Sequence, residues 1–357
     1  MDKLIQAKQI LRSCFGNKGI WASDARYRYQ CWTRDFIIAV LPLLLETNDR
    51  KGLQLAKHHL NELAKRQKSS GQIPILFLDN TLRWLAIKAM NSLESGRLSF
   101  MLKQFMSEDG VFNLTPWTKD SELLYLLGVG RYYQHTQDLE FIEAHSKSVD
   151  RAWEYIEQNL MYQGLILGSD WRDTRPDHSR RMLLTNNCFL YEAYQLHGMH
   201  LQAEATKAAI REHFWTGKHY RDFLGVDEFD TFGNALAILT DIATPEETVE
   251  IMTSAKELDT PYGYRLNGVT LPPKDEKERQ LMQRINQNGV IWPYIHGFMT
   301  MAQHHAGYTD LAKESFAKYQ AQVDFFEFYD PESGAGHGSA NQLWSACLFL
   351  RCWNMLH

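Results

Sequence analysis

The sequence lacks the paired cysteines of a disulfide framework or a zinc site. Its 357 residues hold five cysteines, an odd number, and no two of them form a Cys-x-x-Cys pair. It also lacks an uninterrupted apolar run of the ~18 residues that a membrane-spanning helix needs. Its first residues are amphipathic, with no apolar core of signal-peptide length. We therefore expect a cytoplasmic protein with reduced, buried thiols and no membrane partner.

Motifs for metal, nucleotide and serine chemistry are missing as well. The adjacent pairs His58–His59 and His304–His305 would point to different faces of a helix, and no His-Glu-x-x-His motif is present. No glycine-rich phosphate loop and no Gly-x-Ser-x-Gly elbow occurs. The net charge of -5 lacks the basic excess that nucleic acid would favour. We expect no metal, no cofactor and no nucleic-acid partner.

Signals for β-hairpins are scarce, and helical periodicity dominates instead. Apolar residues recur at three- and four-residue steps over stretches such as 35–46, 138–160 and 187–214. Joints rich in Gly, Pro and Asp separate pairs of these stretches. Roughly a dozen helices of ordinary length would account for the chain. We predict an all-α fold, an (α/α)6 barrel, as a single catalytic domain over residues 1–357.

Aromatic and charged residues concentrate at the joints, which is where a rigid scaffold usually carries binding and chemistry. The first such stretch contains Trp32, Arg34 and Asp35. Together they offer a stacking ring, a forked donor and an acceptor, a set that suits the hydroxyls of a sugar. The alternative is structural, because Asp35 could cap the apolar helix that follows it.

The second stretch is a turn between two helices. It contains Asp170, Trp171, Arg172, Asp173 and Arg175. A carboxyl group near a tryptophan can have its pKa raised enough to stay protonated and act as a general acid. A solvated loop with local ion pairs is the alternative interpretation.

The third stretch carries Glu327 between two pairs of aromatic residues, just before the turn signal Asp-Pro-Glu-Ser-Gly. Apolar walls that exclude water suit a catalytic carboxylate, although a helix-end acid flanked by core residues would look similar. Trp292 precedes Pro293 at a predicted helix start and could form a wall of the same cleft. Paired carboxylates are the groups that glycoside hydrolysis requires.

Five motifs of the chain resemble, in the same order, those of six-hairpin glycosidases. They are "YQCWTRDF", "GSDWRDTR", "FDTFGNALAILTDIATPEE", "NGVIWPYIHGF" and "FFEFYDPESGAGHGSANQLWSA". The likeness runs from about residue 27 to residue 350 and is strongest to the amylo-α-1,6-glucosidase (glycogen-debranching) and neutral/alkaline invertase branches. It implies an (α/α)6 barrel that hydrolyses a glycosidic bond with inversion of the anomeric configuration.

The resemblance also implies roles for single residues. Asp173 is similar to the general acid, with Asp170, three residues earlier, as the alternative, and Glu327 is similar to the general base. Arg34 and Asp35 resemble the pair that holds hydroxyls of the cleaved sugar. The full set expected to bind substrate is Trp32, Arg34, Asp35, Asp170, Trp171, Arg175, Trp292, His296 and Tyr329. The expected substrate is an α-glucoside or a related small oligosaccharide.

Three other functions stay open at this point. A sugar epimerase or isomerase on the same barrel would use histidines, and His296 and His337 are the candidates. An inverting phosphorylase would need a basic phosphate pocket, which Arg34, Arg172 and Arg175 could supply. A non-catalytic glycan-binding protein would bind sugars and release no product. The sequence predicts neither the sugar, nor the linkage, nor the oligomeric state.

Overall fold

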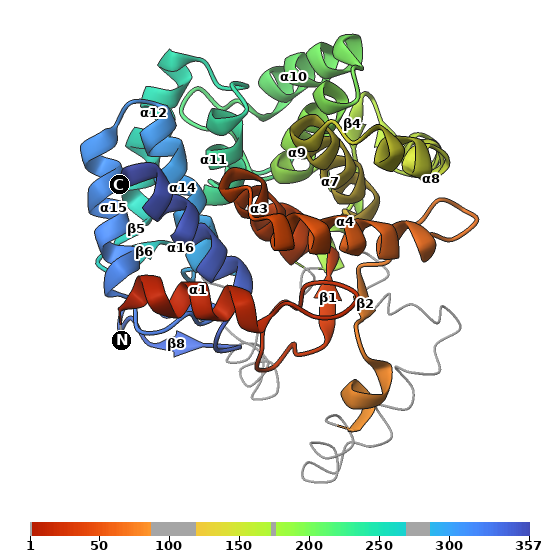
Figure 1. Cartoon of the computed structure of the whole chain (residues 1–357). Helices are drawn as coiled ribbons and strands as arrows, with labels where there is room; N and C mark the ends of the chain where they lie inside the picture. The colour runs from red at the N-terminus through yellow and green to blue at the C-terminus, as the bar shows by residue number, and fades with distance from the viewer. Residues whose placement is uncertain (1, 87–118, 173–175, 269–285) are drawn as a thin grey trace.

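The structure, a computed structural model, describes residues 2–86, 119–172, 176–268 and 286–357. Helices dominate these residues and form two concentric rings, so the predicted (α/α)6 barrel is confirmed. The first helix, α1, packs against the last, α16, so the N-terminal and C-terminal helices lie side by side and close the ring (Figure 1).

Within the described residues, the inner ring contains six helical segments. In chain order they are the continuous α2 (Thr33–Asp35), η1 (Phe36–Val40) and α3 (Leu41–Thr47), then α7 (Ser121–Thr136), α9 (Leu184–Leu196), α11 (Thr231–Leu239), α14 (Pro293–His305) and α16 (Leu343–Leu356). The outer helices are α1 (Lys3–Ser13), α4 (Arg50–Lys65), α8 (Leu139–Asn159), α10 (His200–Phe214), α12 (Pro245–Ala255) and α15 (Thr309–Ala321). Each inner segment contacts the next one, and α16 contacts η1.

The difference between inner and outer helices follows from their apolar residues. Every residue of α7 from Ser121 to Gly130 is buried, and so is every residue of α11 from Thr231 to Ile238. A helix that is buried on all sides has to be surrounded by other helices. The outer helix α4 buries one stripe, which includes Ala56, Leu60 and Leu63, and leaves the rest to solvent. Burial of these stripes stabilises the outer ring on the inner one.

The first inner helix contains a π-helical turn just before a proline. Residues Phe36–Val40 form this turn, and Pro42 stands near the start of α3. Proline has no N–H to donate, and its ring crowds the carbonyl group four residues earlier. The wider turn accommodates the proline without ending the helix. All five residues of the turn are buried, so the helix continues through the core.

The periodic stretch 187–214 belongs to two helices rather than one. Helix α9 ends at Leu196, α10 begins at His200, and Gly198 between them has a φ of +71°. A residue in the left-handed region commonly ends a helix, and glycine adopts that region without a Cβ clash. The chain reverses here from the inner ring to the outer ring.

Short antiparallel strand pairs tie the joints together, although the scarcity of hairpin signals predicted no strands. The pairs are β1 (Gln30–Trp32) with β2 (Leu76–Leu78), β3 (Met161–Tyr162) with β4 (Leu165–Ile166), β5 (Asp259–Thr260) with β6 (Gly263–Tyr264), and β7 (Phe328–Tyr329) with β8 (Gly336–His337). Each strand is two or three residues long. Strand β1 leads directly into α2, and the pair β7–β8 lies between Glu327 and α16.

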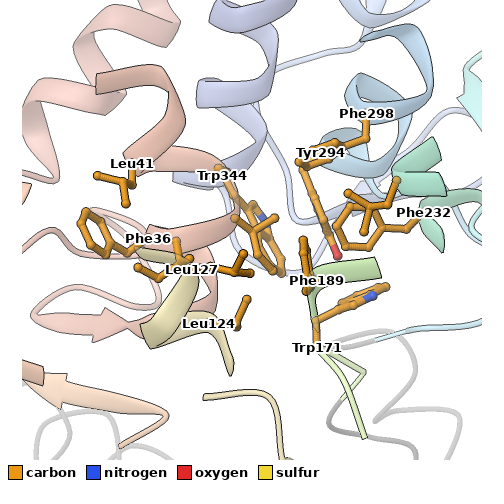
Figure 2. Packing of buried hydrophobic residues seen from close by; sticks show 14 of the residues in the cluster. Phe36, Leu41, Leu124, Leu127, Trp171, Phe189, Phe232, Tyr294, Phe298 and Trp344 are labelled. Atoms are coloured by element: carbon orange, nitrogen blue, oxygen red, sulfur yellow. The ribbon is translucent and has the colours of Figure 1, made fainter. Parts of the chain in front are cut away.

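Aromatic and aliphatic side chains fill the centre of the inner ring. Figure 2 shows several of them at close range, among them Phe36, Leu124, Leu127, Phe189, Phe232, Tyr294 and Trp344. Trp171, from the joint before α9, lies at the edge of this packing (Figure 2). The barrel is therefore closed by side chains along its axis, and any site has to lie at one of its two ends.

Candidate active site

The predicted site residues gather at the end of the barrel where the inner helices begin. Trp32, Arg34 and Asp35 start the first inner helix, Asp170 and Trp171 precede α9, Trp292 and His296 start α14, and Glu327 and Tyr329 precede α16. Each outer helix returns the chain to this end before the next inner helix starts. Segments far apart in the sequence therefore meet here, whereas Asp173 and Arg175 lie outside the described residues.

Glu327 is a buried carboxylate with donors on both oxygens. Its side chain is 6 % exposed. The Tyr27 hydroxyl donates a hydrogen bond of 2.9 Å to Oε1, and the backbone N–H of Ser339 donates one of 2.9 Å to Oε2. The Arg26 guanidinium, partly exposed, lies 3.8 Å from Oε2. An ionised carboxylate accepts on both oxygens in this way, and an acid without such donors would be costly to bury.

The turn after Glu327 holds its carboxylate in place by close backbone approach. Gly338 has a φ of +77°, and a Cβ built on it would lie 2.5 Å from Oε2 of Glu327. The next residue, Ser339, supplies the N–H that binds the same oxygen. Two residues before Gly338, a Cβ built on Gly336 would lie 2.2 Å from the ring of Phe326. The glycines of "GAGHG" thus let the β7–β8 hairpin wrap around Glu327.

Arg34 forms a forked ion pair with Asp120, which precedes α7. The Arg34 Nε donates to Oδ2 of Asp120 at 2.6 Å, and Nη2 donates to Oδ1 at 3.1 Å. Both residues are almost fully buried. Burial raises the pKa of Asp120, and the Arg34 guanidinium opposes that shift. The pair joins the first two inner helices at the end that carries Glu327.

Asp35 and Trp32 lie beside this pair. Asp35 is buried, and its Oδ1 accepts a hydrogen bond of 3.3 Å from the side-chain amide of Gln342, at the start of α16. Trp32 is half-buried, its indole N–H donates to Gln30, and its ring lies edge-on to Tyr27 with centroids 6.0 Å apart. The Trp32 ring therefore lies next to Tyr27, which donates to Glu327, and part of the Trp32 surface stays free for stacking.

Asp170, the alternative acid, is fully buried and bound to Arg172. Its two oxygens accept hydrogen bonds from the Arg172 side chain at 3.0 and 2.8 Å. Burial is the largest single influence and raises the pKa of Asp170, but the Arg172 charge, the Arg172 hydrogen bonds and His178 together outweigh it, so the pKa is lowered overall. A general acid has to be protonated at the working pH. The placement of Asp170 therefore does not favour an acid role for it.

Trp171 and Trp292 pack into one aromatic cluster with Tyr294 and Trp344. The Trp171 and Trp292 ring centroids are 4.9 Å apart, and Tyr294 stacks on Trp344 at 4.2 Å. Trp171 and Trp292 are 2 % and 1 % exposed, so their rings contact other side chains rather than solvent. Figure 2 shows Tyr294 and Trp344 within the packed centre of the barrel and Trp171 at its edge. Trp171 and Trp292 therefore do not form side walls for stacking. With Tyr294 and Trp344 they form the floor of this end of the barrel.

Several polar atoms of this floor have no hydrogen-bond partner within the part of the chain that the structure describes. They are the indole Nε1 of Trp171 and of Trp344, the hydroxyl of Tyr294 and Oε1 of Gln342. Buried donors and acceptors without partners are costly, and most buried polar groups in proteins are paired. Three donors and one acceptor left free at this end suit a ligand rich in hydroxyl groups.

His296 and Tyr329 bind backbone groups. The Nδ1 of His296 accepts from the backbone N–H of Tyr264 at 3.2 Å, and Nε2 lies 2.8 Å from the carbonyl of Ser315, to which it donates. Burial lowers the pKa of His296 to about 4, so the ring is neutral near pH 7. The Tyr329 hydroxyl lies 2.7 Å from the carbonyl of Val323. With both ring nitrogens engaged, His296 has no free group for proton transfer.

No protein-family model matches the chain, and no curated protein matches its sequence. Solved structures do match. Mannosylglycerate hydrolase of family GH63 from Thermus thermophilus, in complex with glucose, superposes with a TM-score of 0.68 over 98% of this chain and 99% of that chain, at 13% identity. An alanine variant of a glycosidase in complex with glucose gives 0.68 over 99% and 96%, at 14% identity.

A third match is an uncharacterized conserved protein from Thermus thermophilus, with a TM-score of 0.67, 13% identity, and coverage of 99% of this chain and 100% of that chain. The shared feature is the fold. At such low identity the superposition says that this chain and the glycosidases have the same helical barrel over nearly their whole lengths, and activity has to be argued from the site.

The sequence reasoning missed the residues that hold the predicted ones. Tyr27, Ser339 and Gly338 contact Glu327, and Asp120 holds Arg34. Tyr27 stands in the same short stretch as Trp32, and the three glycines after Glu327 predict close backbone contact, so both signals were present. Asp120 gave no signal, because its partner lies 86 residues earlier in the chain.

Within the described residues, no group of three or more His, Cys, Asp and Glu side chains could hold a metal ion. No helix among the residues that the structure places is long and apolar enough to cross a membrane. The five cysteines are buried and unpaired with one another.

Proposed function

We propose that this chain is a glycoside hydrolase that uses Glu327 as its general base. The observation that carries the proposal is the environment of Glu327, a buried carboxylate held on both oxygens by Tyr27 and Ser339 at the end where the inner helices begin. The free donors on the aromatic floor and the barrel fold shared with glycosidases support it. The whole chain serves as one catalytic domain in this proposal.

Asp173 is the general acid in the proposed mechanism. Asp170, the other candidate, is bound on both oxygens by Arg172 in the interior. Asp173 follows Arg172 directly in the chain and lies outside the described residues. It donates its proton to the glycosidic oxygen as the bond between that oxygen and the anomeric carbon breaks.

Glu327 takes a proton from the water that attacks the anomeric carbon from the opposite face. The new bond forms opposite the one that breaks, so the configuration inverts, and both carboxyl groups return to their first protonation states by exchange with solvent. Inversion needs carboxyl groups about 6.5–9.5 Å apart, which leaves room for the water. The hydrogen bonds from Tyr27 and Ser339 fix the position of the Glu327 carboxylate relative to the aromatic cluster before substrate binds.

The proposed substrate is a small α-glycoside, and the free donors Trp171 Nε1, Trp344 Nε1 and Tyr294 Oη bind its hydroxyl groups. Mannosylglycerate hydrolase is among the proteins with this fold, so glycosides of glycerate belong in the test panel. The reaction takes place in a reducing compartment, which the buried free thiols suit. The proposed localisation is cytoplasmic.

The rival functions receive less support from the described residues. A phosphorylase needs free cationic groups, whereas Arg34 and Arg172 are each bound by carboxylates. A histidine-based epimerase needs a ring nitrogen that can move a proton, and both nitrogens of His296 bind backbone groups.

A hydrolysis screen of the purified protein tests the proposal. Sucrose, maltose, isomaltose, trehalose, glucosyl- and mannosylglycerate and aryl α- and β-glycosides are each incubated with and without phosphate, and proton NMR records the first-formed anomer. Release of free sugar of inverted configuration without phosphate is the expected result. Turnover that requires phosphate would show a phosphorylase, and retention of configuration would overturn the assignment of Glu327 as a base.

A further inference from the structure

One arginine in the interior lies among three carboxylates beneath the predicted site. The Arg172 guanidinium donates to Asp170 from Nε at 3.0 Å and from Nη2 at 2.8 Å. It also donates to Asp222 from Nη1 at 2.6 Å and from Nη2 at 2.7 Å. All three side chains are 1 % exposed or less. These two carboxylates engage all three nitrogens of the guanidinium fork.

The third carboxylate, Asp230, stands outside the fork. Its Oδ1 lies 3.9 Å from Nη1 of Arg172, beyond hydrogen-bond distance, and has no hydrogen-bond partner within the described residues. Its Oδ2 caps α11 by accepting from the backbone N–H of Gly233 at 2.7 Å, and it accepts from the Thr185 hydroxyl at 3.2 Å. Asp230 is fully buried. A cap needs one oxygen, so the other is free to carry a proton.

Charge counting separates Asp230 from its neighbours. With every group ionised, the cluster of Arg172, Asp170, Asp222 and Asp230 (the Arg172 cluster) has three negative charges against one positive charge. Like charges in a dry interior cannot all stay ionised, and a buried charge without a partner is strongly disfavoured. Burial is the largest cause that raises the pKa of Asp230, to about 7, with Asp222 and Asp170 adding to it and Arg172 opposing it.

Among the residues that the structure describes, the groups around Asp230 on the neighbouring elements supply no second positive charge to it. On α9, burial raises the pKa of the Cys188 thiol, which therefore stays neutral. On α14, burial raises the pKa of Tyr294, and its hydroxyl stays neutral as well. His178, on the short helix η2 (Pro176–Arg180), lowers the pKa of Asp170, and Asp170 raises the pKa of Asp120.

The Arg172 cluster ties the chain that enters Asp173 to two inner helices. Asp173 directly follows Arg172, and consecutive Cα atoms are about 3.8 Å apart, so the cluster holds the chain up to the residue before Asp173. The backbone N–H of Arg172 donates to Asp170, and the carbonyl of Asp222 accepts from the N–H of Leu184, the first residue of α9. Asp230 begins α11. A shift of the arginine would therefore move the chain on either side of it.

We propose that the Arg172 cluster positions the segment that leads into Asp173, and that Asp230 is the member of the cluster that keeps its proton. The structural part of this inference stands on the cluster alone, and the catalytic part rests on the proposed function. Asp222 and Asp230 are positioning residues in this view, since neither has to touch the substrate.

Thermal unfolding between pH 4.5 and 8.5 tests the proton on Asp230, with Asp230→Asn and Asp222→Asn compared with the wild type. The folded state binds the Asp230 proton more tightly than the unfolded state does, so this carboxyl makes the wild type less stable as pH rises from about 4 to about 7. Asparagine cannot ionise. The Tm of Asp230→Asn relative to wild type should therefore rise over this window and stay level above it.

Asp222→Asn should behave in the opposite way. It replaces a carboxylate that accepts two hydrogen bonds from a buried guanidinium, and its Tm should therefore fall below that of the wild type. Glu192→Gln is the matched control, because Glu192 accepts the same forked pair from Arg131 at 2.6 and 2.7 Å in a half-buried position at the other end of the barrel. Two results together would show that the proton is not on Asp230. The Tm of Asp230→Asn would fall as far as that of Asp222→Asn, and it would vary with pH as the Tm of the wild type does.

Hydrogen exchange tests the positioning without any assay of activity. In Asp222→Asn, the amides of residues 168–172 should exchange faster than in wild type, and in Glu192→Gln they should not. Unchanged exchange in Asp222→Asn would overturn the positioning role. Faster exchange in a protein that cleaves no glycoside would uphold the positioning and refute the proposed function, so the two failures are distinguishable.

If the wild type cleaves a glycoside, kcat and KM can be measured separately. Their separate changes distinguish a positioning role from a loss of stability alone. Asp222→Asn should lower kcat by up to roughly a hundredfold with little change in KM, because a misplaced acid loses reactivity more than binding. The measurement is made well below the Tm of the variant. A kcat equal to that of Glu192→Gln would contradict the catalytic part of the inference.

Discussion

The two ends of the barrel differ in how deeply their charged side chains are buried. Where the inner helices begin, Glu327, Arg34, Asp120 and Arg172 are buried and held by short hydrogen bonds. Where the same helices end, ion pairs such as that of Arg351 with Glu46 lie partly in solvent. A buried charge is costly and needs a reason, whereas a surface pair costs little. This difference in burial supports the placement of the proposed site at the first end.

Two surface hollows lie at the other end of the barrel. Hollows of about 650 and 450 Å³ open where the inner helices end, the first beside Asp241 and Tyr308 and the second beside Arg131 and Phe298. Their charged side chains are satisfied by protein partners, such as Glu192 for Arg131. Volume without an unsatisfied or strongly perturbed group is weak evidence for chemistry, and perturbed buried groups are the better guide here.

The largest effect on stability is expected from Arg34→Ala. This change leaves Asp120 buried without its counter-charge, and should lower the free energy of unfolding by about 3–5 kcal/mol. The matched change at the other end, Arg351→Ala, should cost about 1 kcal/mol or less, because Glu46 remains in water. Urea unfolding of both variants measures the difference.

The loss in Arg34→Ala should shrink toward acid pH. Burial already raises the pKa of Asp120, and without Arg34 the folded state binds the Asp120 proton more tightly still. Stability then falls as pH rises through the acid range, so the gap to wild type is smallest near pH 4. Equal losses for the two arginine variants at all pH values would break the comparison between the ends.

A smaller effect, on turnover rather than stability, is expected from Gly338→Ala. The added Cβ would lie 2.5 Å from Oε2 of Glu327, so the carboxylate has to move, and a shift of this kind can lower turnover by up to roughly a hundredfold. Gly217→Ala is the control, because Gly217 also has a positive φ, +93°, with nothing within 4 Å of the added Cβ.

Both glycine variants carry the same kind of backbone strain, about 1–2 kcal/mol. Their Tm values should therefore fall together while their turnover numbers separate. Equal turnover in the two variants would mean that the position of Glu327 does not matter to the reaction.

The smallest of these effects is expected from Tyr27→Phe, which removes a close hydrogen-bond donor from Glu327. A hydrogen bond to a charged group contributes about 1.5–3 kcal/mol, and its loss should lower turnover about tenfold or somewhat more. Tyr155→Phe removes a hydroxyl that binds the side-chain amide of Gln72, away from Glu327, and should leave turnover unchanged. Steady-state rates of both variants distinguish a role at Glu327 from a general loss of tyrosine hydroxyls.

The ring of helices could be predicted because local patterns determine it. Apolar residues surround α7 and α11 on all sides and form one stripe on α4, and these patterns separate inner from outer helices. Glycine, proline and aspartate at the joints placed the helix starts, and with them the end that carries Glu327. The turn at Gly198 was missed, since periodicity continues across it.

The partners of the site residues could not be predicted in the same way. The fork of Arg34 is bound by Asp120, and the ring of Trp171 packs on Trp292, through contacts that only the closed ring creates. Helical periodicity says which face of a helix is buried, but it does not say whether a ring at a joint points to solvent or to the axis. The substrate-binding roles of these residues stay predictions, as does the acid role of Asp173.

The most direct measurement compares Glu327→Gln with Glu192→Gln on the glycoside that the wild type cleaves best. Both changes replace a carboxylate by an amide of the same shape at opposite ends of one barrel. We predict that Glu327→Gln keeps its fold and loses turnover by roughly 10²–10⁴-fold, while Glu192→Gln retains the wild-type rate. A Glu327→Gln variant as active as Glu192→Gln would contradict the assignment of Glu327 as the base.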